Sequence, residues 1–153
     1  MIKLNVVAVG KLKEKFWVDA IAEYRKRIGR YAELNVIECP EGIDEGNAEK
    51  LQKAEEGGIL KKLKGYVVLL AIDGDQLSSE DLASFIDKTS ARGISEFSFI
   101  IGGSRGVSEE IRKRADKAIS FGKATYPHQL MRVILTEQLY RAMSIINNSS
   151  YHK

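Results

Sequence analysis

The stretch Tyr-Val-Val-Leu-Leu-Ala-Ile, residues 66–72, is the most continuous apolar run in the chain. A strand that is apolar at successive positions, and not only at alternate ones, is typical of a parallel sheet covered by helices on both faces. The stretch therefore predicts the buried centre of an α/β fold.

Strand-like runs alternate with runs of helical periodicity on both sides of this stretch. We expect further strands over residues 2–9, 33–38 and 96–101, and a short one over 119–121. We expect helices over residues 14–31, 47–63, 78–91, 108–117 and 127–145, followed by a polar tail over 147–153. Gly57-Gly58 lowers the helix propensity of the second of these helices. The alternation predicts one α/β domain over residues 1–153, built on a parallel sheet.

Length and composition exclude several classes of protein. A chain of 153 residues has room for one core and no separate recognition domain. Its one cysteine and two histidines offer no metal site, and Cys39 is expected to be a buried structural thiol. No apolar run approaches the roughly 20 residues of a membrane span, and the N-terminus lacks a signal-peptide pattern. We therefore expect a cytoplasmic protein that does not enter membranes.

The formal net charge of +3 conceals a strong segregation along the chain. Residues 1–31 carry eight Lys or Arg and three Asp or Glu, a net charge of +5, and residues 111–153 carry eight and two, a net charge of +6. Residues 32–65 and 66–110 carry net charges of −3 and −5. We expect the two basic ends to form one phosphate-facing surface, although a segregation without function is the alternative.

Three loops follow the carboxyl ends of buried strands, where open α/β sheets bind ligands. They cover residues 71–76, 102–106 and 122–126. The middle loop, Gly-Gly-Ser-Arg-Gly, lets the backbone approach a ligand closely, but its spacing is not that of the dinucleotide fingerprint G-x-G-x-x-G. A cofactor loop and a merely tight turn are equally compatible with it.

The last quarter of the chain holds both histidines and a very apolar helix. His128 follows Pro127, where a structural helix-opening residue is the simpler interpretation. The tail Tyr151-His152-Lys153 combines an aromatic ring, a group that titrates near neutrality and a cation, although an inert chain end is the alternative. The helix over 127–145 is apolar around much of its circumference, which indicates either burial against a second subunit or a fully buried central helix.

Six blocks of sequence, in order along the whole chain, carry a family resemblance. They are Val-Gly-Lys-Leu-Lys-Glu-Lys (9–15), Leu-Ala-Ile-Asp-Gly (70–74), Ile-Gly-Gly-Ser-Arg-Gly (101–106), Ser-Phe-Gly-Lys-Ala-Thr-Tyr-Pro-His-Gln-Leu-Met-Arg (120–132), Glu-Gln-Leu-Tyr-Arg-Ala (137–142) and Tyr-His-Lys (151–153). With these blocks the chain resembles the bacterial large-subunit rRNA (pseudouridine-N3)-methyltransferases of the SPOUT class.

This resemblance implies a SPOUT fold with a C-terminal trefoil knot, S-adenosyl-L-methionine as methyl donor and no metal. It also implies a homodimer with its sites at the interface. The implied substrate is a pseudouridine in the intersubunit-bridge stem-loop of 23S rRNA, met on assembled ribosomes. Carried over by position, the cofactor-binding residues are Leu70, Gly102, Gly103, Phe121, Gly122, Lys123, Ala124, Thr125 and Tyr126.

Methylation of an imide nitrogen requires loss of its proton and stabilisation of the developing negative charge. We therefore expect His152 to accept that proton or to hold the imide edge, and Tyr151 to pack on the base. Lys153 and Arg141 would position phosphate or stabilise charge.

Two positions depart from the family pattern, Arg105 and the segment 147–150, where Gly and Pro are frequent before the terminal Tyr-His. Arg105 either reaches RNA or is solvated on its loop. Two other functions remain open: a non-catalytic ribosome- or rRNA-binding protein, and a small-molecule nucleotide enzyme.

Overall fold

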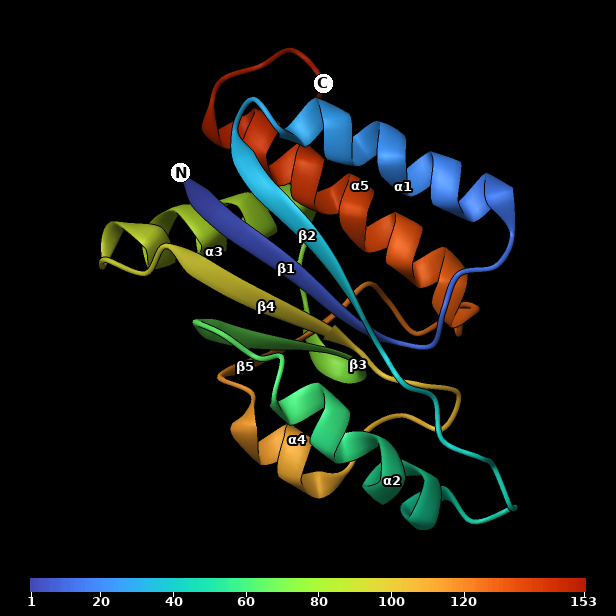
Figure 1. The fold of residues 1–153 in the computed structure, drawn as a ribbon. Helices are drawn as coiled ribbons and strands as arrows, with labels where there is room; N and C mark the ends of the chain where they lie inside the picture. Colours follow the sequence, from blue (N-terminus) through green and yellow to red (C-terminus); the bar gives the residue numbers. More distant parts are fainter.

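The apolar run at 66–72 forms an inner strand of a five-stranded parallel sheet (Figure 1). The computed structural model describes all residues 1–153. The strand order is β2-β1-β4-β3-β5, so the predicted α/β class is confirmed. The elements along the chain are β1 (Ile2–Val9), α1 (Lys15–Ile28), β2 (Ala32–Cys39), α2 (Ala48–Leu60), β3 (Tyr66–Gln76), α3 (Ser79–Ala91), β4 (Glu96–Ile101), α4 (Glu109–Arg114), β5 (Lys117–Ser120) and α5 (His128–Ile146).

Helices cover both faces of the sheet, as the apolar character of the strands predicts. One layer contains α1, α3 and α5, and the other contains α2 and α4 (Figure 1). The larger core lies under the first layer, where Phe97, Phe99 and Leu135 are fully buried. A smaller core lies under α2 and α4. None of the helices has the length and apolar character of a membrane span.

β3 runs four residues further than predicted, because tertiary pairing extends it. The turn expected at Asp73-Gly74 is instead an irregular part of the strand, in which Leu70 and Asp75 both pair with Ile119 of β5. Residues 71–74 therefore bulge out of the ladder at the carboxyl end of β3. Gly74 makes this geometry possible, since a Cβ there would lie 2.7 Å from backbone atoms of Ala118 and Ile119.

We expect Gly74→Ala to destabilise the protein by about 1–3 kcal/mol, because the methyl group must push β5 away from β3. Gly57→Ala is the matched control, since Gly57 lies in α2 with open space at its Cβ position. There alanine should stabilise by about 0.5–1 kcal/mol through its helix propensity. Urea unfolding of the two variants checks both signs, and equal stability of the two would contradict the proposed strand contact.

Other differences from the predicted elements also have local causes. α4 ends at Arg114, before the predicted residue 117, because Asp116 turns to β3: its backbone N–H donates to Val67 O and its carboxylate accepts from Val67 N, both at 2.8 Å. α2 continues through Gly57-Gly58. Cys39 is buried, as predicted, and burial raises the pKa of its thiol.

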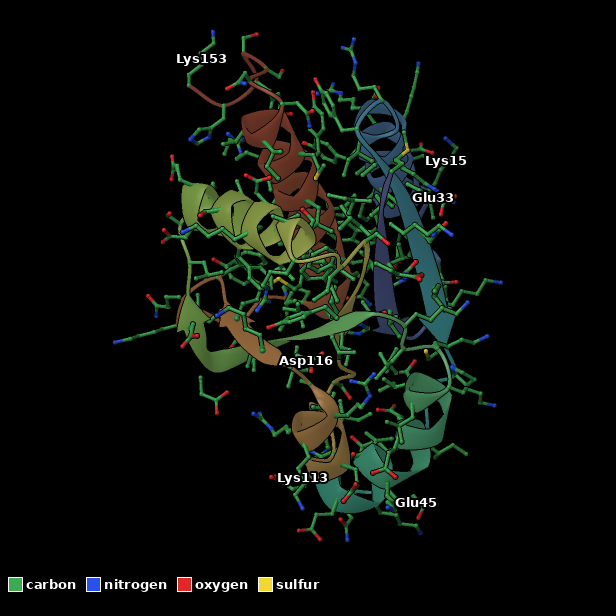
Figure 2. The ribbon with its side chains drawn as sticks, turned by 90° about the vertical axis from the view of Figure 1, so that its left-hand side faces the viewer. Lys15, Glu33, Glu45, Lys113, Asp116 and Lys153 are labelled. Carbon is green, nitrogen blue, oxygen red and sulfur yellow. The ribbon has the colours of Figure 1, made fainter.

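The two basic ends of the chain form no continuous surface, which corrects that expectation in part: α1 and α5 pack side by side, but α4 lies in the other layer. Lys15 on α1 and Lys113 on α4 lie on opposite sides of the sheet (Figure 2). The cations of residues 111–153 are divided further, because Arg132 is completely buried and Arg141 is paired with Glu137. Helix α5 therefore contributes no row of free positive charge.

Candidate functional site

A cavity of about 470 Å³ opens at the carboxyl ends of β4, β3 and β5. All three loops that the sequence singles out contribute to its wall, because these strands are neighbours in the sheet. Its wall is mostly apolar. The lining residues are Leu69, Leu70, Ala71, Ile72, Asp73, Ile101, Gly102, Gly103, Gly106, Val107, Arg112, Ile119, Ser120, Phe121, Thr125, Tyr126, His128 and Met131.

Six of the nine expected cofactor-binding residues line this cavity: Leu70, Gly102, Gly103, Phe121, Thr125 and Tyr126. Gly122, Lys123 and Ala124 belong to the same loop but do not line it. Gly122 shapes the turn that leaves β5, where its N–H donates to Ser120 Oγ at 3.1 Å and Ser120 Oγ donates to its carbonyl at 3.0 Å. The sequence therefore locates the cavity correctly at the level of loops.

The glycine loop after β4 is both a tight turn and a cavity wall. A Cβ on Gly102 would lie 2.8 Å from Val107 Cγ1, and one on Gly103 would lie 2.8 Å from the carboxylate of the buried Glu55. A side chain at either position would crowd these neighbours, so glycine allows the close packing behind the loop and leaves its backbone bare. The tight turn is therefore confirmed, and the role as a cofactor loop stays a prediction.

Arg105 fastens this loop to the rest of the molecule. Its Nε lies 2.8 Å from Asp44 Oδ2, and its carbonyl accepts from Gln52 Nε2 of α2 at 2.6 Å. The Arg105 hydrogen bond, followed by one from the Gly46 N–H, lowers the pKa of the Asp44 carboxyl. The side chain is therefore neither free in solvent nor extended toward a ligand in this structure.

Sequence reasoning misses the roles of two residues one turn apart on α5: His128, which lines the cavity, and Arg132, which anchors the helix without lining the cavity. His128 lines the cavity, and its Nδ1 is buried without a hydrogen-bond partner. The placement of a histidine directly after Pro127, at a helix start that follows a strand end, is the signal that points to it.

Arg132 is the largest fully buried side chain in the molecule, and it ties α5 to the ends of two strands. Its Nη1 lies 2.8 Å from Glu38 Oε2, and its Nη2 donates to Gly10 O at 3.1 Å. Burial lowers the pKa of the guanidinium, and the ion pair with Glu38 opposes that effect. This long-range pair joins positions 94 residues apart, so no local pattern predicts it.

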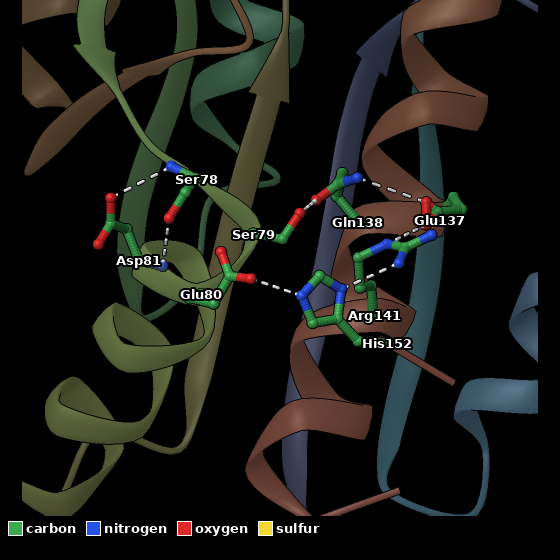
Figure 3. A network of polar contacts seen from close by, with 8 residues as sticks. All are labelled: Ser78, Ser79, Glu80, Asp81, Glu137, Gln138, Arg141 and His152. Carbon is green, nitrogen blue, oxygen red and sulfur yellow. Dashed lines mark hydrogen bonds and ion pairs between the residues drawn. The ribbon is translucent and has the colours of Figure 1, made fainter. Parts of the chain in front are cut away.

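The C-terminal tail is folded against α5 and α3 and is not a free end (Figure 3). His152 Nδ1 lies 3.0 Å from Arg141 Nη1, and His152 Nε2 lies 2.5 Å from Glu80 Oε1. Arg141 in turn donates from Nε to Glu137 Oε1 at 2.7 Å. The Tyr151 ring packs on the Arg141 guanidinium, and burial raises the pKa of its hydroxyl. Three of the four expected catalytic residues, Arg141, Tyr151 and His152, thus form one cluster, and Lys153 is exposed beside it.

The partners of His152 decide its tautomer. Arg141 can only donate, and an ionised Glu80 can only accept, so the assigned tautomer accepts at Nδ1 and carries its hydrogen on Nε2. A hydrogen bond from its own backbone N–H, and then the one from His152, lower the pKa of Glu80. In this arrangement His152 has no free lone pair for a substrate proton, whereas its Nε2–H is directed at an anion.

Within one chain, the tail cluster and the cavity lie at opposite ends of α5. His128 at the start of the helix lines the cavity, and the tail follows Ile146 at the other end (Figure 1). The tail folds back so that His152 lies beside Arg141, which is 13 residues or roughly 20 Å along the helix from His128, and His152 does not line the cavity of its own chain.

The outward face of α5 carries an unexplained apolar strip. Leu130, Val133 and Ile134 are half-buried, yet they pack into neither core. Glu137 and Arg141 continue the same helix face toward the tail. Half-buried apolar side chains outside the cores are typical of a face that another subunit covers.

Three findings relate the chain to other proteins. A family model described as "Predicted SPOUT methyltransferase" matches residues 2–152. A protein of Lactobacillus acidophilus, named "Ribosomal RNA large subunit methyltransferase H", is 48% identical to this chain over 157 aligned positions, which cover 98% of this chain and 99% of the relative. A solved structure of a probable methylase family protein from Haemophilus influenzae is similar with a TM-score of 0.55, over 99% of this chain and 70% of that one. Its identity is 12%, so this last likeness concerns the fold alone.

Proposed function

This chain belongs to the SPOUT methyltransferase family, and on that premise we propose that it methylates N3 of a pseudouridine in 23S rRNA. The proposed target is the stem-loop that bridges the ribosomal subunits, modified on assembled ribosomes in the cytoplasm. S-adenosyl-L-methionine is the proposed methyl donor. The proposal includes one domain over residues 1–153, with the C-terminal trefoil knot that the family resemblance implies.

The cavity at the strand ends suits this cofactor. Its apolar walls match the faces of a purine ring, and the exposed glycine backbone of Gly102 and Gly103 offers N–H and C=O groups to polar edges. The unpartnered Nδ1 of His128 leaves a polar group that a ligand can satisfy. Leu70, Phe121, Thr125 and Tyr126 would hold the cofactor with these glycines, and Gly122, Lys123 and Ala124 would complete the loop around it.

When bound, S-adenosylmethionine supplies an electrophilic methyl group on a sulfonium centre. The chain has to orient the base for attack and stabilise the charge that appears as its N3 proton leaves. His152 suits the second task, because its Nε2–H donates to the Glu80 carboxylate and could donate in the same way to an imide anion. Of the two roles expected for His152, holding the imide edge therefore fits its hydrogen bonds better than accepting the proton.

The remaining residues of the tail cluster would support His152. Arg141 fixes the ring through Nδ1 and carries the positive charge closest to the base, while Glu137 fixes Arg141. Tyr151 would pack against the base, and Lys153 would contact a phosphate.

We propose a homodimer in which the tail of one chain completes the cavity of the other. Two features support it: the separation of cavity and tail along α5, and the apolar strip of Leu130, Val133 and Ile134 between them. An antiparallel pairing of two α5 helices would bury both strips and bring each tail to the partner's cavity.

The observation that carries the proposal is the cavity at three adjacent strand ends in a chain that matches the family model from end to end. Calorimetric titration with S-adenosylmethionine should show binding. Incubation with ribosomes from a strain that lacks the enzyme should then incorporate labelled methyl groups into 23S rRNA. Binding to ribosomes without cofactor binding or methyl incorporation would favour a non-catalytic rRNA-binding protein instead.

A further inference from the structure

His128 has an environment that a purely structural helix-opening residue does not explain. Its Nδ1 is buried and has no hydrogen-bond partner. Nε2 has none within the protein either, since the histidine hydrogen bonds of the structure belong to His152. An orphaned buried nitrogen costs roughly 1–3 kcal/mol unless a partner arrives. The ring also lines the cavity that the cofactor is proposed to fill.

The ring is held in a fixed position. A Cβ on Gly10 would lie 3.7 Å from His128 Cε1, so the imidazole lies against the end of β1. One turn further along α5, Arg132 donates to the Gly10 carbonyl at 3.1 Å and pairs with Glu38. The start of α5 is therefore joined to the end of β1 one turn away from the ring, which presents a preorganised polar group to the cavity.

The lining of the cavity indicates which half of the cofactor His128 meets. Met131, on the same face of α5, and Leu69, Ile119 and Val107 give the cavity apolar walls. Such walls suit the nucleoside half, whose purine ring is flat and apolar on its faces but polar at its edges. The charged groups of the cavity, Asp73 and Arg112, lie at the exposed rim, where they pair with each other at 3.4 Å.

Resting on the proposed function, we propose that His128 is a cofactor-binding residue that hydrogen-bonds the nucleoside half of S-adenosylmethionine. The bound ligand supplies the hydrogen-bond partner that the ring lacks within the protein. Neutral imidazole can donate at one nitrogen and accept at the other, so it can pair with an adenine edge or a ribose hydroxyl.

Calorimetric titrations with three ligands test this assignment. They are S-adenosylmethionine, S-adenosylhomocysteine and methylthioadenosine, which keeps the nucleoside and lacks the amino-acid half. His128→Phe keeps a planar, slightly larger ring without the nitrogens, and His128→Asn preserves a polar atom near the position of Nδ1. We expect His128→Phe to weaken binding of all three ligands roughly three- to tenfold, the value of one neutral hydrogen bond. His128→Asn should stay within about twofold of the wild type.

Gln129→Ala, the next residue on α5 and outside the cavity lining, is the matched control and should bind all three ligands as the wild type does. Circular dichroism and a thermal melt of each variant separate lost binding from lost folding, and His128→Leu, which also lacks both ring nitrogens, decides should His128→Phe not fold. Wild-type affinity in His128→Phe, or a loss that spares methylthioadenosine, would overturn the assignment. A wild-type chain that binds none of the three ligands would overturn the proposed function, and this inference with it.

Discussion

We expect His152→Ala to lower the rate of methyl transfer to ribosomes by about 10²- to 10³-fold, while the dissociation constant for S-adenosylmethionine stays unchanged. The reason is geometric: the Nε2–H of His152 is already directed at the Glu80 carboxylate, and the imide anion would take that place. His152 does not line the cavity and is proposed to contact the base and not the cofactor, so its loss should leave cofactor binding intact. Methyl incorporation under saturating cofactor measures the rate, and calorimetry measures the affinity.

His152→Gln distinguishes the two roles that the sequence assigns to this residue. Glutamine keeps a donor but is no base at neutral pH, so a donor role predicts partial rescue and a proton-accepting role predicts none. Lys88→Ala removes a positive charge at an exposed position of α3. It is the control for the loss of a surface charge and should retain full activity. Full activity of His152→Ala would remove the residue from the mechanism.

The second large effect concerns stability. We expect Glu38→Ala to lower the free energy of unfolding by about 2–3 kcal/mol, because it leaves the guanidinium of Arg132 buried without its counter-ion. The value lies below that of a fully buried pair because the Glu38 side chain is 37% exposed, against 0% for Arg132. The variant also loses the hydrogen bond from Leu12 N to Glu38. Urea unfolding at constant pH measures the change.

Glu33→Ala provides the control on the same strand, since Glu33 is exposed and its loss should change stability by no more than about 0.5 kcal/mol. The double variant Glu38→Leu/Arg132→Met removes both charges and should recover much of the loss. Equal stability of Glu38→Ala and Glu33→Ala would show that the buried cation does not depend on its partner.

The sequence predicts strands and helices well where local signals agree with tertiary contacts. The run at 66–72 and the start of α3 at Ser78, with its capping box to Asp81, are examples. The errors arise where distant residues decide. β3 continues past Ile72 because β5 pairs with it, and α4 stops early because Asp116 bonds to Val67. Neither partner is visible in a local window of sequence.

For the site, the sequence predicts which loops meet, because parallel strands end at one edge of the sheet. It does not predict the buried Arg132, whose partner is 94 residues away, or the unsatisfied nitrogen of His128. The tail shows the same limit. Its polar residues indicate a free end, whereas Tyr151 and His152 are held by contacts to α5 and α3 that only the folded chain creates.

The separation of cavity and tail along α5 has a consequence for how activity scales. In the proposed dimer each chain contributes to both sites. The number of working sites is therefore proportional to the number of dimers and not to the total number of chains. Below the dissociation constant of the dimer, halving the protein concentration removes more than half of the activity, although every chain stays folded and its cavity stays intact. Methyltransferase activity then rises with roughly the square of the protein concentration until most chains are paired.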